Sequence, residues 1–256
     1  MHLIIFNLLK IIRKHTESKT NVLLTKGFEE LTADEDCTSL LKKYLTDEVY
    51  EELQEEVTEL KCTLLNCIQS GLDNHDSSIG VYAPDAESYY MFASLFDPII
   101  EEYHGFDSEA VQPDSDWGDA NLFVDVDPAG DFVQSTRIRC GRSLEGFPFN
   151  PCMTQENYTE SMEKVKFVLM DLCDDLKGSF YPLDEMSDEE KNALIDRHIL
   201  FKEGDRFLQS AGASRFWPHG RAIFMNDLKT FIVWVNEEDH LRIISMEPSG
   251  NLGEFL

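Results

Sequence analysis

Apolar residues recur at steps of three and four positions through the first part of the chain. The spacing runs from Leu23 to His104, through SLLKKYL, VYEELQEEV, CTLLNCIQ and a long stretch from Asp85 to Tyr103. Such spacing places apolar side chains on one face of a helix. Thr46 and Pro84 stand just before two of these segments, where a capping hydroxyl or a first-turn proline favours a helix start. We therefore predict a small all-α domain over residues 23–110.

Two polar stretches interrupt this pattern. The sequence GLDNHDSSIG, from Gly71 to Gly80, is rich in small and polar residues, which predicts an exposed mobile loop. Residues Gly105 to Asp131 carry proline, aspartate and glycine with little periodicity. We interpret them as a linker, with a domain boundary near residue 110.

Beyond the linker the pattern becomes mixed. It predicts a strand over Asp131–Arg139 and two helices, over residues 154–176 and 187–198. Three apolar segments follow, RAIFMN, TFIVWVN and LRIISME, joined by the short turns NDLK and EEDH. Short connections favour antiparallel neighbours, because parallel strands need long crossovers. We predict an α+β domain over residues 111–256, with an antiparallel sheet flanked by helices.

The chain begins with the apolar run MHLIIFNLLKII, which ends at Arg13 and Lys14. A run of about a dozen residues is too short to span a bilayer, for which about 20 are needed. It also lacks a cationic start and a small-residue cleavage site, so a secretory signal is not indicated. We expect residues 1–22 to form an atypical N-terminal extension, either an amphipathic helix or an unusual start ahead of the fold.

Acidic residues dominate the charge of the chain, with 49 Asp and Glu against 22 Lys and Arg and a formal net charge of −27. This balance argues against a nucleic-acid partner, whose binding depends on cationic contacts with phosphate. The six cysteines lack the CxxC spacing of metal and redox sites and are too sparse for a disulfide scaffold. We therefore expect reduced thiols in a cytoplasmic protein.

Positive charge gathers at one place, the segment QSTRIRCGR, which contains Arg137, Arg139 and Arg142. No Lys or Arg occurs between Cys62 and Thr136, where there are fifteen Asp and Glu. In an extended segment the first two arginines project to the same side, about 7 Å apart. That spacing suits neighbouring phosphate groups held by guanidinium forks. The alternative is a pair of structural salt bridges to nearby acids.

A second cluster of charged residues, NEEDHLR, follows the apolar strand TFIVWV. It contains Glu237, Glu238, Asp239, His240 and Arg242. Three adjacent carboxylates repel one another, so burial of even one of them near a cationic substrate would create a base with a shifted pKa or a clamp for the substrate. A solvated acidic turn is an equal alternative. A metal site is a weaker one, since no second ligand cluster stands at helical spacing.

Three further residues could belong to a ligand site. His198, at the end of a predicted helix, could stack on a ligand ring, although a cap or core role is more common there. Arg215 and Arg221 would join the arginine pair if the strands brought them beside it. No P-loop, glycine-rich dinucleotide turn or GxSxG elbow occurs. A nucleotide would therefore be held by arginines and not by a backbone cradle.

Several long blocks resemble the phosphagen kinases, and among them the arginine kinases. The likeness extends from about Phe28 to Ser245 and rests on blocks that recur in order and spacing: CIQSG, IGVYAPDAE, LFDPIIEEYH, WGD, STRIRCGRSLEGFPFNPC, FKEGDRFLQ and TFIVWVNEEDHLRIISM. It implies a phosphagen kinase fold, a helical guanidino-substrate domain followed by a catalytic domain. It also implies reversible transfer of the γ-phosphoryl group of ATP to L-arginine, with Mg²⁺ held through the nucleotide phosphates and no metal bound directly by the protein.

The resemblance also assigns site residues. It implies that Glu238 orients the substrate guanidinium and accepts its proton. The remaining roles it implies are ATP binding by Arg137, Arg139, His198 and Arg242, binding of the substrate's amino-acid end by Ser77, Ser78, Ile79 and Tyr82, and a domain-closure pair formed by Asp76 and Arg206.

The chain departs from the family pattern at several points. The pattern continues past this chain's last residue, through a reactive-cysteine motif CPTNLGT, two more phosphate-binding arginines and a loop with a second substrate carboxylate. We therefore expect a truncated catalytic domain whose sheet has an unpaired edge. Ser78 stands where glycine is usual and Ser214 where cysteine is usual. The expectation is a monomeric enzyme. One alternative is a non-catalytic paralogue that binds nucleotide or pairs with a full-length kinase subunit. The other is a chain that does not fold stably.

Overall fold

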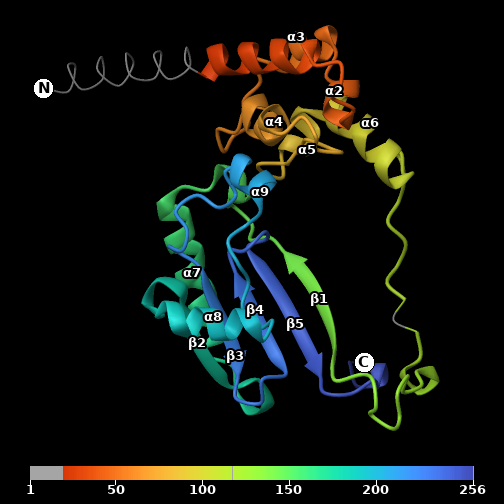
Figure 1. The fold of residues 1–256 in the computed structure, drawn as a ribbon, viewed down its shortest axis with the longest axis vertical. Helices are drawn as coiled ribbons and strands as arrows, with labels where there is room; N and C mark the ends of the chain where they lie inside the picture. The colour runs from red at the N-terminus through yellow and green to blue at the C-terminus, as the bar shows by residue number, and fades with distance from the viewer. Residues whose placement is uncertain (1–19, 117, 256) are drawn as a thin grey trace, which may run out of the picture. The chain divides into compact units, whose positions relative to one another are not determined.

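The computed structural model describes residues 20–116 and 118–255. Residues 1–19, which hold most of the expected N-terminal extension, lie outside the described residues. The chain divides into two compact units: residues up to 110 together with 206–212, and residues 111–205 together with 213 onward. Figure 1 shows that the first consists of helices and that the second is built on a sheet. None of the described helices combines the length and apolar character that crossing a membrane requires.

Helices make up the first unit, as the apolar spacing predicts. Residues 20–33 are helical, and Ser39 and Thr46 cap the next two helices through their hydroxyl groups. The segment predicted as one long helical run divides at Phe92. The named helices of this unit are α2 (Leu40–Tyr44), α3 (Asp47–Leu53), α4 (Leu64–Asp73), α5 (Ser88–Met91), α6 (Ala93–His104) and α9 (Arg206–Ser210). They bury a core of leucine, isoleucine and phenylalanine side chains.

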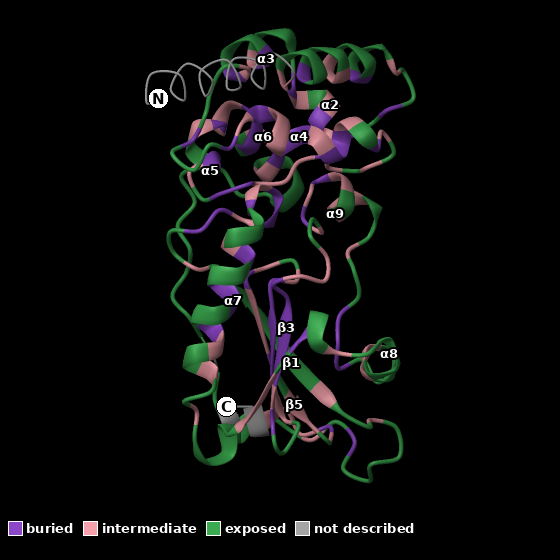
Figure 2. Cartoon of the chain, turned by 90° about the vertical axis from the view of Figure 1, so that its left-hand side faces the viewer, coloured by how far each residue is buried: buried purple, intermediate pink, exposed green. Residues whose placement is uncertain are grey.

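A five-stranded antiparallel sheet forms the centre of the second unit, in the order β1-β5-β4-β3-β2. Figure 2 shows helices α7 and α8 on opposite sides of it. The predicted α+β fold class is therefore confirmed. The strands are β1 (Thr136–Arg142), β2 (Gly178–Pro182), β3 (Ala222–Asn226), β4 (Phe231–Val235) and β5 (Leu241–Glu247), the helices are α7 (Gln155–Leu169) and α8 (Asp188–Asp196), and five short 3-10 turns are η1 (Ala120–Leu122), η2 (Asn150–Cys152), η3 (Asp174–Leu176), η4 (Leu183–Glu185) and η5 (Leu252–Phe255).

Side chains from alternate positions of each strand enter two different cores, since successive residues of a strand face opposite sides of a sheet. On the α7 side, Phe224 and Val233 pack with Met162. On the α8 side, Ile223, Trp234 and Ile244 belong to the buried cluster that also contains residues 199–201.

Some element boundaries differ from the sequence-based expectation. The first strand begins at Thr136 and not at Asp131, because the Asp127 carboxylate accepts the backbone N–H groups of Phe132 and Val133 and bends the chain there. Helix α7 ends at Leu169 instead of near residue 176, and Asp174, with φ +51°, breaks the helical path. Strand β2, which follows, was not predicted.

Buried polar contacts hold the turn between β4 and β5 in place. His240 is 1% exposed: its Nδ1 accepts from the Leu144 N–H at 2.8 Å, and its Nε2 donates to the Pro148 carbonyl at 2.9 Å. Asn150 donates through Nδ2 to the carbonyls of Glu237 and Glu238. Both sides of the turn are therefore tied to residues 144–150, which fixes the position of its carboxylates.

Arg221 is a structural cation and not part of the arginine pair on β1. It is 1% exposed and donates to the carbonyls of Ala213, Arg215 and His219 at 3.0 to 3.1 Å. Its guanidinium lies 4.3 Å from the centre of the Tyr158 ring. Arg215 likewise donates to backbone, to the carbonyl of Met153 among others. The interpretation that Arg221 joins the phosphate site is wrong.

We expect Arg221→Met to destabilise the protein by about 2–4 kcal/mol, because three buried carbonyl groups lose their donor. The free energy of unfolding, measured by urea denaturation, gives the value. Arg197→Met, at an exposed position, is the matched control and should change stability little. Equal stability of the two variants would contradict a structural role for Arg221.

The buried His240 should make stability depend on pH. Burial lowers the pKa of His240, so the unfolded chain, in which histidine titrates near about 6.5, takes up the proton more readily. The stability that the buried, neutral His240 contributes is complete above the pKa of histidine in the unfolded chain, and it is lost as the pH falls below that value. We expect the free energy of unfolding to drop between about pH 7 and pH 5, and to drop less steeply in His240→Gln. His104→Gln, which changes an exposed histidine, should keep the wild-type slope.

Candidate active site

Three arginines form a row on one face of the sheet. In the pairing of β1 with β5, Arg139 stands opposite Ile244, and Gly141 stands opposite Arg242. Directly opposite residues of an antiparallel pair share a face, as do residues two apart on one strand. Arg137, Arg139 and Arg242 therefore lie on the same face, the one that also carries Ile244. Strand β1 is exposed along most of its length (Figure 2).

The segment that follows α8 contacts this row. Arg137 donates through Nη1 to the carbonyl of His198 at 3.3 Å. His198 has a left-handed backbone, with φ +57°, and its side chain is exposed. The next residue, Ile199, accepts a hydrogen bond from Trp234 Nε1 at 2.7 Å and is thereby held to β4. Arg137 and His198, which the resemblance assigns to one ligand, are thus neighbours in the second unit.

Arg242 is surrounded by the three carboxylates of the turn. Its guanidinium nitrogens lie 3.0 Å from Glu237 Oε2, 2.7 Å from Glu238 Oε2 and 3.4 Å from Asp239 Oδ2. Burial opposes the charge of Arg242, but the hydrogen bond with Glu238 and the charges of the three acids together raise its pKa. Arg242 is thus paired with neighbouring acids in this structure, and its part in nucleotide binding stays a prediction.

Arg137 and Arg139 differ from Arg242 in this respect. Within residues 20–116 and 118–255, neither has a carboxylate at ion-pairing distance, and both are exposed. Two uncompensated guanidinium groups on one face keep their capacity to bind an anion.

The structure identifies which carboxylate of the turn is buried and shows a close approach at Gly141, neither of which the sequence specified. Glu237 has a side chain only 15% exposed, and burial raises the pKa of its carboxyl group although Arg242 and a backbone N–H lower it. Gly141 leaves room for Asp239, since a Cβ at that glycine would stand 2.4 Å from Asp239 Oδ2. A glycine within an arginine-rich strand was the available signal for this close approach.

The geometry does not support a metal site at the turn. Both ring nitrogens of His240 are engaged by backbone groups, so this residue is not available as a ligand. Across the described part of the chain, no three His, Cys, Asp or Glu side chains are grouped so that they could hold a metal ion. All six cysteines are free thiols.

The loop that the resemblance assigns to substrate binding is held by backbone hydrogen bonds within the first unit. The carbonyls of Ser78 and Ile79 accept from the N–H groups of Leu40 and Leu41 at 3.0 and 2.8 Å. The Tyr82 N–H donates to the carbonyl of Cys67. Ser77 begins this stretch, and its N–H donates to the carbonyl of Asn74 at 3.0 Å.

The expectation of an exposed loop from Gly71 to Gly80 is wrong at both ends. Residues 71–73 continue α4, and both glycines are buried. They approach each other so closely that a Cβ at Gly71 would lie 2.4 Å from the Gly80 carbonyl oxygen. The glycines therefore serve close packing of two backbone segments and not flexibility.

Asp76 and Arg206 form an ion pair, and Arg206 also donates to Asn74 Oδ1 at 2.9 Å. Helix α9 packs beside α4, where Ser70 Oγ donates to the Phe207 carbonyl at 2.8 Å. Both members of the pair thus belong to the first unit, although Arg206 comes late in the sequence. Their part in domain closure stays a prediction.

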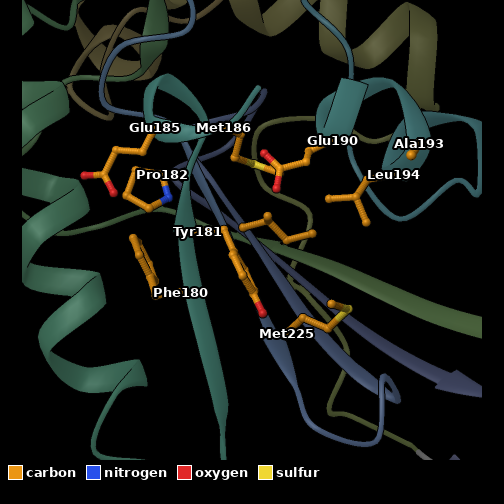
Figure 3. Close-up of a pocket in the computed structure, with 10 residues that line it drawn as sticks. Phe180, Tyr181, Pro182, Glu185, Met186, Glu190, Ala193, Leu194 and Met225 are labelled. Carbon is orange, nitrogen blue, oxygen red and sulfur yellow. The ribbon is translucent and has the colours of Figure 1, made fainter. Parts of the chain in front are cut away.

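A pocket of about 450 Å³ lies in the second unit, lined by residues of β2, β3 and α8. Figure 3 shows Tyr181, Leu194 and Met225 among its lining, with Glu190 at one side. Its polar groups include two carboxylates, Glu185 and Glu190, and no cation. This chemistry does not suit phosphate groups, and the pocket contains none of the site residues assigned from the sequence.

Two family models match the chain. The model described as ATP:guanido phosphotransferase, N-terminal domain, matches residues 35–101, and the model of the C-terminal catalytic domain of the same family matches residues 160–256. The first match lies within the helical unit, and the second runs from within α7 through β5 to residue 256 and includes α9.

Arginine kinases from crustaceans are similar to the chain over most of its length. The chain is 60% identical to an arginine kinase of Penaeus vannamei over 232 residues, which make up 90% of this chain and 65% of that protein. It is 57% identical to an arginine kinase of Callinectes sapidus over 239 residues, 93% of this chain and 67% of that protein. The chain thus spans about two thirds of the length of these relatives.

Solved structures share the fold. The duplicated taurocyamine kinase of Schistosoma mansoni with bound transition state analog components matches with a TM-score of 0.82 and 38% identity, over 90% of this chain and 32% of that chain. Lombricine kinase matches with a TM-score of 0.77 and 36% identity, over 84% of this chain and 60% of that chain. With both domain models, the relatives and the fold in agreement, this chain belongs to the ATP:guanido phosphotransferase family as a homologue of the arginine kinases.

Proposed function

We propose that the protein transfers the γ-phosphoryl group of ATP reversibly to the guanidino nitrogen of L-arginine. One observation supports this above the others: Arg137, Arg139 and Arg242 share a face of the sheet, and Glu238 lies beside the third of them. Phosphoryl transfer is mainly a matter of positioning and charge neutralisation, and this arrangement offers cations for the phosphates and a carboxylate for the guanidinium.

The arginine row serves the nucleotide in this proposal. Planar guanidinium groups bind phosphate oxygens in pairs, and two of the three arginines have no acidic partner among the described residues. The His198 carbonyl accepts a hydrogen bond from Arg137, and we assign the His198 side chain to the adenine. When bound with the nucleotide, Mg²⁺ would neutralise charge on the polyphosphate and would be held through the phosphates.

Glu238 serves the guanidino substrate. Its carboxylate already binds one guanidinium at 2.7 Å, that of Arg242, and its side chain is 46% exposed. A second guanidinium can approach the same carboxylate from solvent. As the N–P bond forms and the bond to ADP breaks, the attacking nitrogen must lose a proton, which Glu238 accepts. Ser77, Ser78, Ile79 and Tyr82 of the first unit receive the amino-acid end of L-arginine, and the pair Asp76 and Arg206 takes part in closure.

The first test concerns the nucleotide. We expect Arg137→Ala and Arg139→Ala each to weaken binding of MgATP about 10-fold, because each removes a charge-assisted hydrogen-bonding group. Isothermal titration calorimetry measures the affinity. Arg142→Ala is the matched control: the residue lies on the same strand but on the opposite face, and it removes the same charge.

Equal losses in all three arginine variants would show that net charge and not the row determines the affinity. Unchanged affinity in Arg137→Ala and Arg139→Ala would contradict the assignment of the nucleotide site altogether.

The second test concerns the chemistry. We expect the purified chain to convert ATP and L-arginine in a coupled assay of ADP release, and Glu238→Gln to lower kcat about 100-fold while MgATP affinity stays within about threefold. Glu185→Gln, which changes a carboxylate outside the site, is the control. If the folded wild-type chain binds MgATP without turnover, the alternative of a non-catalytic nucleotide-binding paralogue is favoured instead.

A further inference from the structure

His75 makes a close contact with a segment far from it in the sequence. Its Nδ1 lies 2.5 Å from Asp34 Oδ2, and the two side chains are 28% and 31% exposed. Because the carboxylate oxygen accepts, Nδ1 carries the proton. This hydrogen bond is the main reason why the pKa of the Asp34 carboxyl is lowered, so the acceptor is ionised at neutral pH.

Three consecutive side chains bind the loop of residues 74–80 to two different segments of the first unit. Asn74 and Asp76 both contact Arg206 of helix α9. His75, between them, contacts Asp34 at the end of the first helical segment. The loop is therefore held on one side by α9 and at a separate point by residues 34–41.

Residues 34–41 also hold the far end of the loop. The N–H groups of Leu40 and Leu41, at the start of α2, donate to the carbonyls of Ser78 and Ile79. Lys42 of the same helix donates to the Asp34 carbonyl, which connects Asp34 to α2. The contact between His75 and Asp34 and the two backbone bonds thus fix both ends of the short stretch 75–79 against one support.

This stretch contains the residues that the proposed function assigns to L-arginine. Since α2 engages the carbonyls of Ser78 and Ile79, these two residues are left with their N–H groups and the Ser78 hydroxyl to offer an amino-acid ligand. The positions of those groups depend on how residue 75 is held. A shift of about 1 Å in a positioning segment is enough to weaken a site of this kind.

We propose that His75 is a positioning residue for the guanidino substrate, which acts by holding the loop 74–80 to Asp34. The identity of the ligand rests on the proposed function, whereas the anchoring rests on contacts within the first unit. The role is one of geometry: His75 holds the loop and does not take part in the transfer.

The test compares His75→Leu, which removes the donor, with His75→Gln, whose amide N–H can still reach a carboxylate. We expect the affinity for L-arginine, measured by calorimetry, to fall about fivefold or more in His75→Leu and in Asp34→Asn, and to stay within about twofold in His75→Gln. MgATP affinity should not change in any of them. His104→Leu, at an exposed position in the same unit, is the control.

A second measurement needs no ligand. Amide hydrogen exchange at Leu40 and Leu41 reports the two bonds that hold the loop to α2, so we expect faster exchange in His75→Leu and wild-type exchange in His75→Gln. Unchanged exchange and unchanged L-arginine affinity in a folded His75→Leu variant would overturn the proposal.

The two proposals fail in different ways. A wild-type chain that binds no L-arginine contradicts the proposed function. In that case exchange alone decides the anchoring: acceleration in His75→Leu with rescue in His75→Gln supports it, and equal rates overturn it.

Discussion

The antiparallel pairing of β1 with β5 is the interaction on which the candidate site depends. It places Gly141 opposite Arg242 and thereby aligns an arginine from one strand with two from another. A slip of one residue would turn Arg137 and Arg139 to the opposite face, where Ile138 and Cys140 now lie. The register is supported by Ile244, buried between its neighbours on the sheet, and by the contact of Asp239 with Gly141. The apolar core thus determines where the cations stand.

Buried polar side chains hold in place the turn that carries Glu238. His240, Asn150 and Asn236 all use their side chains on backbone groups around the turn that carries Glu238. In a low-dielectric interior such bonds are strong when they are satisfied and costly when they are not, so the turn has little freedom to rearrange. The exposed carboxylate of Glu238 is therefore carried by a rigid segment of backbone, as a site that works by positioning its ligands requires.

Much of this arrangement could be predicted from local patterns. The period of apolar residues indicated the helical unit, the short turns indicated antiparallel pairing, and the spacing of Arg137 and Arg139 indicated a common face. Features that depend on distant partners could not be predicted in the same way. Strand β2 is short and ends in proline, Glu237 is buried by packing, and His240 is occupied by residues almost a hundred positions earlier. The sequence identified Glu237 and His240 as charged or polar residues, but it did not show that the fold buries them.

The environment of Arg242 has a consequence for how two ligands would influence each other. One guanidinium faces three carboxylates, so the cluster as a whole is anionic and repels a polyphosphate. Under the proposed function, a guanidino ligand at Glu238 would bring in a positive charge, reduce that repulsion and release Arg242 toward the phosphates. Thermodynamic linkage makes the effect mutual, so a nucleotide that engages Arg242 frees the carboxylate for the second ligand to the same extent. The charge cluster would therefore couple the two binding equilibria and favour occupation by both ligands over occupation by either one.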